Sequence, residues 1–160
     1  MDLQKLFNPK SIAVVGASPE EGKVGHVIMK NLFEFGFEGK VYLVNPKYDD
    51  IFSQKCYRSL EEIKEPIDLA IFAIPAQLVF PEIEKNADRI KNYVVISARF
   101  SEIGGEGKLR ERKLRGLAEK ENLNILGPKC LGFIVPRLGL NASFAGGMPK
   151  SGATPPASRQ

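Results

Sequence analysis

The sequence has few of the side chains on which redox and metal chemistry depend. Its 160 residues include no tryptophan, one histidine and two cysteines, Cys56 and Cys130. Neither cysteine belongs to a CxxC pair, and two cysteines are too few for a disulfide framework. We therefore expect neither a metal site nor a disulfide-stabilised fold.

Long apolar runs are also absent. No run approaches the roughly 20 residues that a membrane span requires. Met1 is followed by charged and polar residues rather than by the apolar core of a signal peptide. We expect a soluble, cytoplasmic protein that makes no contact with a membrane.

The excess of positive charge is small. Lysine and arginine number 23 against 19 acidic residues, a net charge of +4 that mildly favours anionic partners. The densest basic run, residues 108–115, is interrupted by Glu111 and has the pattern of a solvated helix face. We therefore expect no nucleic-acid partner.

Short apolar segments alternate with amphipathic ones along most of the chain. Helices are predicted over residues 24–35, from the capping box at Ser59 to Pro66, from Pro81 onward and around residues 109–118. The alternation predicts an α/β fold with a doubly wound parallel sheet between two helical layers. Its strands are predicted at residues 11–15, 40–44, 68–74, 93–96 and 124–126.

The alternation stops after Leu131. We expect at most one further short strand, at residues 133–135. Residues 151–160 contain two prolines, a glycine and no aliphatic side chain larger than alanine. They predict a disordered tail or a severed linker, so residues 1–150 are expected to form one domain.

A glycine-rich loop between the first strand and the first helix is the strongest functional signal. Gly16, Ala17 and Ser18 follow the strand, and Gly22, Lys23, Val24 and Gly25 lead into the helix. Backbone N–H groups and the positive end of a helix dipole suit a phosphate at such a turn. The spacing differs from the dinucleotide fingerprint, whose second glycine comes two residues after the first. The alternative is a glycine-rich turn that binds no ligand.

The residues after the second strand bear on which nucleotide is bound. NAD-binding proteins place a carboxylate there to hold the ribose hydroxyls. This chain has Asn45, Pro46 and Lys47, and its first carboxylate is Asp49. Lysine attracts a phosphate on the ribose, so NADP would suit this feature, although the loop lacks the NADP fingerprint. The alternative is that Lys47 is a solvated turn residue.

Several motifs occur in a characteristic order along the chain. They are residues 7–18, 22–25, 44–47, 97–98, 127–128, 130–132 and 139–144. In this order they closely resemble the N-terminal CoA-binding domain of the ADP-forming acyl-CoA (acetyl-CoA) synthetases, relatives of the succinyl-CoA synthetase α subunit. The resemblance covers about residues 6 to 150.

The resemblance implies a Rossmann-like domain that binds CoA or acyl-CoA. Residues 18–25 would hold the phosphates and residues 45–47 the adenosine end. The pantetheine arm would follow Ile74, Pro75, Ser97 and Ala98, with its thiol directed toward residues 127–132, which include Lys129 and Cys130. In the complete enzymes a phosphohistidine of a following domain and an ATP-grasp domain or subunit take part in making acyl-CoA from acid, CoA and ATP.

This chain departs from the family pattern at two positions. Lys129 stands where asparagine is usual, and Arg99 where glycine is common, so both add bulk and charge near the expected thiol end. They could add anion contacts or obstruct exchange. Cys130 is either a small buried residue behind a turn or a thiol near pantetheine. His26 is interpreted as a partly exposed residue near the ligand rather than as the phosphohistidine.

We therefore predict a CoA-binding domain with no catalytic residue of its own. It is either a fragment or a subunit that acts with an ATP-grasp subunit and further domains supplied in trans. One alternative is a stand-alone module that senses CoA or a nucleotide. The other is an NADP-dependent oxidoreductase domain, which the loop spacing disfavours.

Overall fold

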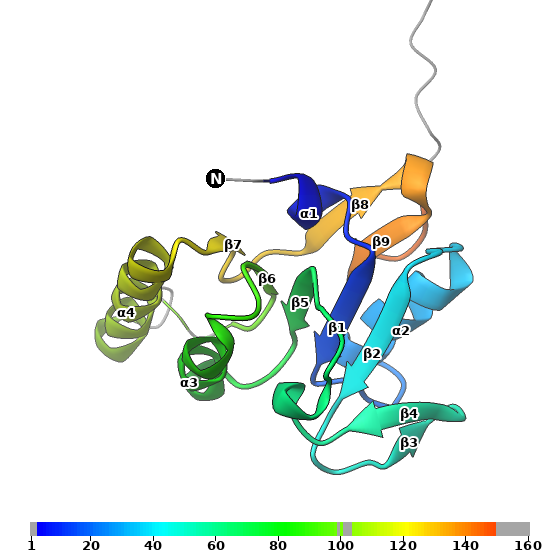
Figure 1. Cartoon of the computed structure of the whole chain (residues 1–160), viewed down its shortest axis with the longest axis horizontal. Helices are drawn as coiled ribbons and strands as arrows, with labels where there is room; N and C mark the ends of the chain where they lie inside the picture. The colour runs from blue at the N-terminus through cyan, green and yellow to red at the C-terminus, as the bar shows by residue number, and fades with distance from the viewer. Residues whose placement is uncertain (1–2, 99, 101–103, 150–160) are drawn as a thin grey trace, which may run out of the picture.

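The computed structural model describes residues 3–98, 100 and 104–149. Its centre is a seven-stranded sheet in the order β3-β4-β2-β1-β5-β6-β7 (Figure 1). All neighbouring strands are parallel except in the β3–β4 hairpin. The strands are β1 (Ser11–Val15), β2 (Lys40–Val44), β3 (Asp50–Ile51), β4 (Gln54–Tyr57), β5 (Leu69–Phe72), β6 (Asn92–Val95) and β7 (Asn124–Leu126).

The sheet is that of a Rossmann-like fold. Without β3, the six parallel strands lie in the order third, second, first, fourth, fifth and sixth along the chain. In such doubly wound sheets the order reverses beside the first strand, and ligands bind beyond the carboxyl ends of the strands at that point. The predicted α/β fold class is confirmed, and the switch point lies between β1 and β5.

One face of the sheet is covered by α3 (Ala76–Asn86), α4 (Gly105–Glu121) and the 3-10 turn η1 (Leu60–Glu62). The inner side chains of β5 and β6, among them Phe72 and Tyr93, alternate toward this layer and are fully buried. Helix α3 contributes Val79 and Ile83, and α4 contributes Leu114 and Leu117.

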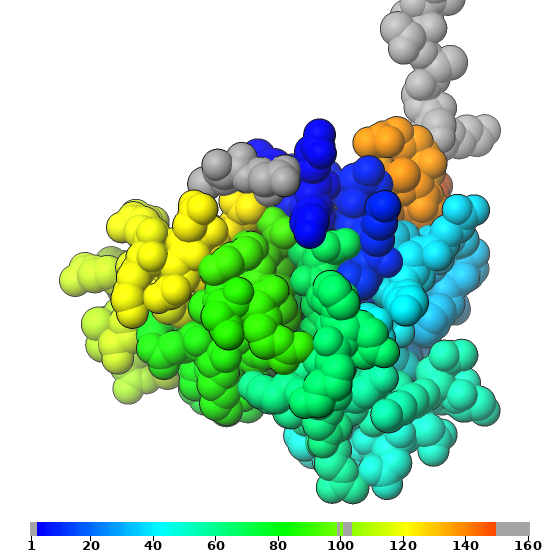
Figure 2. Space-filling model, viewed as in Figure 1, coloured from blue at the N-terminus to red at the C-terminus, as the bar shows by residue number. Residues whose placement is uncertain are grey.

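The other face is covered by α2 (Val24–Glu34), by the short α1 (Gln4–Phe7) and by an antiparallel hairpin of β8 (Gly132–Val135) and β9 (Leu140–Ser143). A 3-10 turn, η3 (Pro136–Leu138), joins the two hairpin strands. The buried Asn31 side chain of α2 donates to the carbonyls of Ser143 (2.9 Å) and Ala145 (3.1 Å) and so ties the hairpin to the helix. In Figure 2 the N-terminal segment (blue) lies at the surface between this hairpin (orange) and the β7–α4 region (yellow). The rings of Phe7 and Phe133 pack edge to face, with their centroids 5.2 Å apart.

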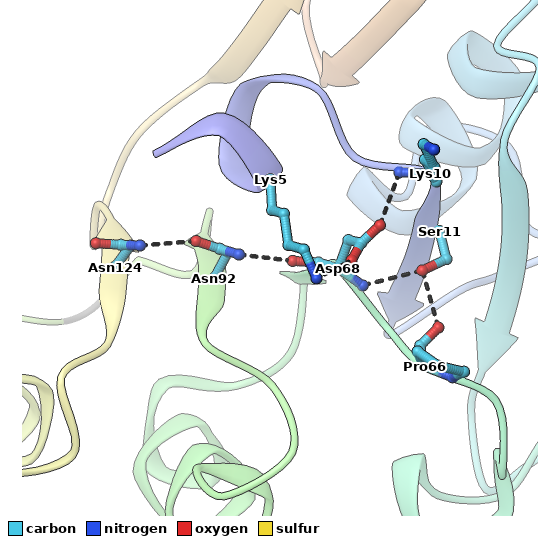
Figure 3. Close-up of polar contacts among 7 residues, drawn as sticks. All are labelled: Lys5, Lys10, Ser11, Pro66, Asp68, Asn92 and Asn124. Carbon is cyan, nitrogen blue, oxygen red and sulfur yellow. Dashed lines mark hydrogen bonds and ion pairs between the residues drawn. The ribbon is translucent and has the colours of Figure 1, made fainter. Parts of the chain in front are cut away.

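A chain of polar contacts joins four parallel strands at their amino ends (Figure 3). The Asn124 amide donates to Asn92 Oδ1 (2.8 Å), and the Asn92 amide donates to the Asp68 carbonyl (2.9 Å). The Asp68 N–H donates to Ser11 Oγ (2.9 Å), which donates in turn to the Pro66 carbonyl (2.9 Å). Buried polar groups stabilise a fold only when they are paired, and these contacts set the register of β1, β5, β6 and β7 at the end opposite the switch point.

At the carboxyl end, helix α2 and the turn after β1 meet through two glycines. A Cβ on Gly25 would lie 1.9 Å from the carbonyl oxygen of Gly16. Gly16 has a φ of +94°, and a Cβ there would lie 2.4 Å from the carbonyl oxygen of Ala73. Neither position has room for a side chain, so the two glycines allow the first turn of α2 to approach the ends of β1 and β5.

The structure corrects several sequence predictions. Pro81 is not the first residue of a helix but lies inside α3, which begins at Ala76 after Pro75. The carbonyl that Pro81 leaves without a donor belongs to Gln77, an exposed residue whose carbonyl water can reach. The capping box does not form: the structure has only the turn η1, and Glu62 accepts instead from the backbone N–H of Arg58 (2.9 Å).

Three short strands were also missed. β3 and β4 are short and polar, and β9 packs on α2 rather than joining the main sheet. The further strand predicted at residues 133–135 is present as β8. The predicted tail, residues 151–160, lies outside the described part of the chain.

The glycine contact predicts a large loss of stability for Gly25→Ala. The added methyl group would overlap the Gly16 carbonyl, so the start of α2 would have to move, at a cost of at least about 2 kcal/mol in the free energy of unfolding. Urea unfolding measures this loss. The matched control is Gly116→Ala in exposed α4, where a Cβ meets nothing within 4 Å and the change should stabilise by about 0.5–1 kcal/mol. Equal unfolding midpoints for the two variants would contradict the close approach.

Candidate functional site

A cleft of about 590 Å³ opens at the carboxyl ends of β1, β2, β4 and β5, beside the starts of α2 and α3. It lies at the switch point of the sheet, where a ligand is expected. Ten of the fifteen residues predicted for the ligand line it. They are Gly16, Ser18, Lys23, Val24, Gly25, Asn45, Pro46, Lys47, Ile74 and Pro75.

The glycine-rich loop leads into the uncapped start of α2. No side chain caps the first turn of this eleven-residue helix, so its N–H groups and positive dipole end remain available to an anion. Ser18 is buried, and its hydroxyl accepts from the Glu20 N–H (3.1 Å), which shapes the loop. The Lys23 ammonium lies 3.8 Å from Glu20 in an exposed pair that contributes little to stability.

Asn45 joins the loop after β2 to the loop after β1. Its amide donates to the carbonyl of Ala17 (2.8 Å), and its Oδ1 accepts from the N–H of Lys47 (3.0 Å). Ala17 itself is buried beneath the loop and does not line the cleft. Lys47 is exposed, and its ammonium forms no ion pair with any residue that the structure describes. This end of the cleft therefore presents a free cation where NAD-binding proteins place a carboxylate.

The opposite wall of the cleft is formed by Ile74 and Pro75, with Leu78 of α3 beside them. Ser97, after β6, does not line the cleft; its hydroxyl donates to the Ile74 carbonyl and supports the wall from behind. Ala98 is exposed and also lies outside the lining. Arg99 lies outside the described residues.

Lys129 and Cys130 lie farther along the sheet edge, outside the cleft lining. The Lys129 N–H donates to the Ser97 carbonyl (3.3 Å), and its side chain is exposed. The Cys130 thiol faces the carbonyls of Val95 (3.6 Å) and Leu126 (3.7 Å). Burial raises the pKa of this thiol, which keeps it protonated and favours its interpretation as a packed residue.

His26 lies in the first turn of α2 but does not line the cleft. Its partly exposed ring meets Phe52, at the tip of the β3–β4 hairpin, edge to face at 5.7 Å. It lines a separate shallow hollow with Lys30 and Gly146. A catalytic role in the cleft therefore has no support from this position.

Sequence reasoning missed five polar residues of the cleft, one of which is Glu82 of α3. Glu20 and Tyr48 lie on the loops already discussed, and the Tyr48 hydroxyl donates to Glu20 at 3.4 Å. Arg58 and Ser59 follow β4, the short parallel strand that was not predicted. Their position directly after a strand was the available signal, but the strand itself has too little apolar character to be recognised.

The described ranges offer no sign of a metal site or a membrane span. Within them, no group of three or more His, Cys, Asp or Glu side chains could hold a metal ion. In the same residues, no helix combines the length and apolar character needed to cross a bilayer.

Comparison with known proteins connects this geometry to a family. A model of the CoA binding domain matches residues 10–136. Acetate–CoA ligase (ADP-forming) I of Archaeoglobus fulgidus is 46% identical over 151 residues, which cover 94% of this chain and 22% of the relative. The α subunit of acetate–CoA ligase (ADP-forming) I of Pyrococcus furiosus is 43% identical over 149 residues, which cover 90% of this chain and 32% of that subunit.

A solved structure shares the fold. It is a dinucleotide-forming acetyl-coenzyme A synthetase 1 from Ca. Korarchaeum cryptofilum, in complex with phosphate and ADP, with a TM-score of 0.83 and 37% sequence identity. The match covers 89% of this chain and 31% of that one. The chain thus spans between about a fifth and a third of the length of these relatives. It belongs to the CoA binding domain family and is homologous to the N-terminal part of the ADP-forming acyl-CoA synthetases.

Proposed function

We propose that this chain binds CoA or an acyl-CoA in the cleft at the switch point. The observation that carries the proposal is that two positive groups face the cleft. The uncapped start of α2 opens into it at one side, and Lys47, which forms no ion pair with a described residue, follows β2 at the other. A helix N-terminus suits a pyrophosphate, and a lysine suits a phosphate on the ribose. Membership of the CoA binding domain family points to the same ligand.

Each part of CoA has a matching part of the cleft in this proposal. The pyrophosphate lies against residues 18–25, with Lys23 as a further donor, and the adenosine end lies against residues 45–47. The pantetheine arm follows the apolar wall of Ile74 and Pro75 toward Ser97. The thiol end then points toward Lys129 and Cys130, which lie farther along the same edge of the sheet.

The role of the chain is to bind and orient the CoA thioester rather than to react with it. Its relatives are named as ADP-forming acetate–CoA ligases, and this chain spans only a part of their length. We propose that an ATP-grasp part and a domain with the phosphohistidine complete the reaction. The description of the Pyrococcus furiosus relative as an α subunit supports such a division of the enzyme.

Thermal unfolding with CoA, and with NAD at equal concentration, tests the proposed ligand. A ligand present at about 100 times its Kd adds about 2.7 kcal/mol to the stability of the folded state, which raises the Tm of a domain of this size by several degrees. We expect such a rise with CoA and a much smaller one with NAD, because Lys47 follows β2 where NAD-binding proteins place a carboxylate. A larger rise with NAD than with CoA would contradict the proposal.

A further inference from the structure

The ribose end of the cleft contains a second cation, Arg58, which follows β4. Val44 of β2 pairs in parallel with Tyr57 of β4, and the Asn45 N–H donates to the Tyr57 carbonyl (2.9 Å). Asn45 and Arg58 are therefore the first residues beyond two adjacent strand ends, which lie about 4.8 Å apart in a sheet. Lys47 and Arg58 both line the cleft, and they approach the same region from neighbouring loops.

The Arg58 residue is held at both ends. Its backbone N–H donates to Glu62 Oε2 (2.9 Å), and its Nη2 donates to Asp49 Oδ1 (2.9 Å). Among the residues that the structure describes, no other hydrogen bond of the guanidinium is present, so Asp49 leaves most of its five N–H donors free. A long side chain that is already oriented loses less conformational entropy when it binds a ligand.

Three cationic side chains line the cleft against two carboxylates, Glu20 and Glu82, and this excess favours a phosphate as the group that Arg58 meets. The Arg58–Asp49 pair is exposed, with 63% and 82% of the two side chains accessible, so solvent screens it. A phosphomonoester carries nearly two negative charges near neutral pH and has three acceptor oxygens. It can therefore bind the free guanidinium nitrogens and the unpaired Lys47 ammonium together, whereas a ribose hydroxyl satisfies neither charge.

We propose that Arg58 and Lys47 form a two-cation site for a phosphomonoester on the ribose of the bound nucleotide, with Asp49 orienting Arg58. This inference rests on the proposed function, in which the phosphomonoester is the 3′-phosphate of CoA. The same chemistry occurs in the 2′-phosphate of NADP. Lys23 has a separate role, because it stands at the start of α2, at the pyrophosphate end of the cleft.

Calorimetric titration of the full chain with CoA and with dephospho-CoA tests the two-cation site. Arg58→Gln and Lys47→Ala should each weaken CoA by roughly three- to tenfold, as expected for partly exposed charged contacts. Neither should change the affinity for dephospho-CoA by more than about twofold, and the double variant should bind both ligands nearly equally. The matched control is Lys55→Gln, which removes the same charge from β4, where the Lys55 ammonium lies 4.4 Å from the centre of the Tyr57 ring and outside the cleft lining.

The outcomes separate this inference from the proposed function. If wild type binds CoA but Arg58→Gln keeps the full preference over dephospho-CoA, or if Lys55→Gln loses as much as Arg58→Gln, the role of Arg58 is overturned. If wild type binds neither form of CoA, the proposed function fails. Titration with NADP and NAD tests the other source of the phosphate. A wild type that binds no CoA but prefers NADP to NAD, with Arg58→Gln abolishing that preference, would support the two-cation site. The same result would overturn CoA as the ligand of that site.

Discussion

The close approach of Gly25 to the carbonyl of Gly16 fixes the position of the proposed anion site. Because neither residue has a side chain, the first turn of α2 lies directly against the ends of β1 and β5. The partial positive charge of the helix start is thereby placed at the switch point of the sheet, where the order of the strands already leaves an opening. Asn45 adds the loop after β2 to the same wall through the carbonyl of Ala17.

The amino end of the sheet differs from the carboxyl end in how its polar side chains are paired. There the contacts among Ser11, Asp68, Asn92 and Asn124 pair the polar groups of adjacent strands with one another. These hydrogen bonds are made within the fold, whereas among the described residues no side chain caps the start of α2. The contrast places the binding capacity at the carboxyl ends of the strands and the stabilising contacts at the amino ends.

The sequence was sufficient for the central features because they depend on local chemistry. Apolar β-branched runs predicted β1, β2 and β5, and the glycine spacing predicted the turn before α2. The prediction was wrong for Pro81, because the buried Ala76 and Val79 stabilise a helical turn ahead of it. It missed β3 and β4 because strands of two and four residues are too short to carry a periodic signal, and the edge pairing of β4 with β2 depends on tertiary contacts.

The residues that line the cleft could be predicted only in part, because some of them follow a strand that the sequence did not reveal. Residues after β1, β2 and β5 were recognised because adjacent strand ends converge in this fold class. Ser97, Lys129 and Cys130 follow strands farther along the sheet, and the sequence does not measure that distance; in the structure they lie behind or beyond the cleft. Arg58 escaped notice together with its strand, although it lines the cleft and its guanidinium donates to Asp49.

The most direct measurement is amide chemical-shift mapping of the isotopically labelled chain during a titration with CoA. If CoA binds in the cleft, we expect saturable shifts at five residues that line it: Gly16, Ser18, Gly25, Asn45 and Arg58. Residues around a second hollow at the amino end of the sheet, among them Lys10, Lys40 and Arg137, should not respond. Shifts confined to that hollow, or no shifts at saturating CoA, would contradict CoA binding in the cleft.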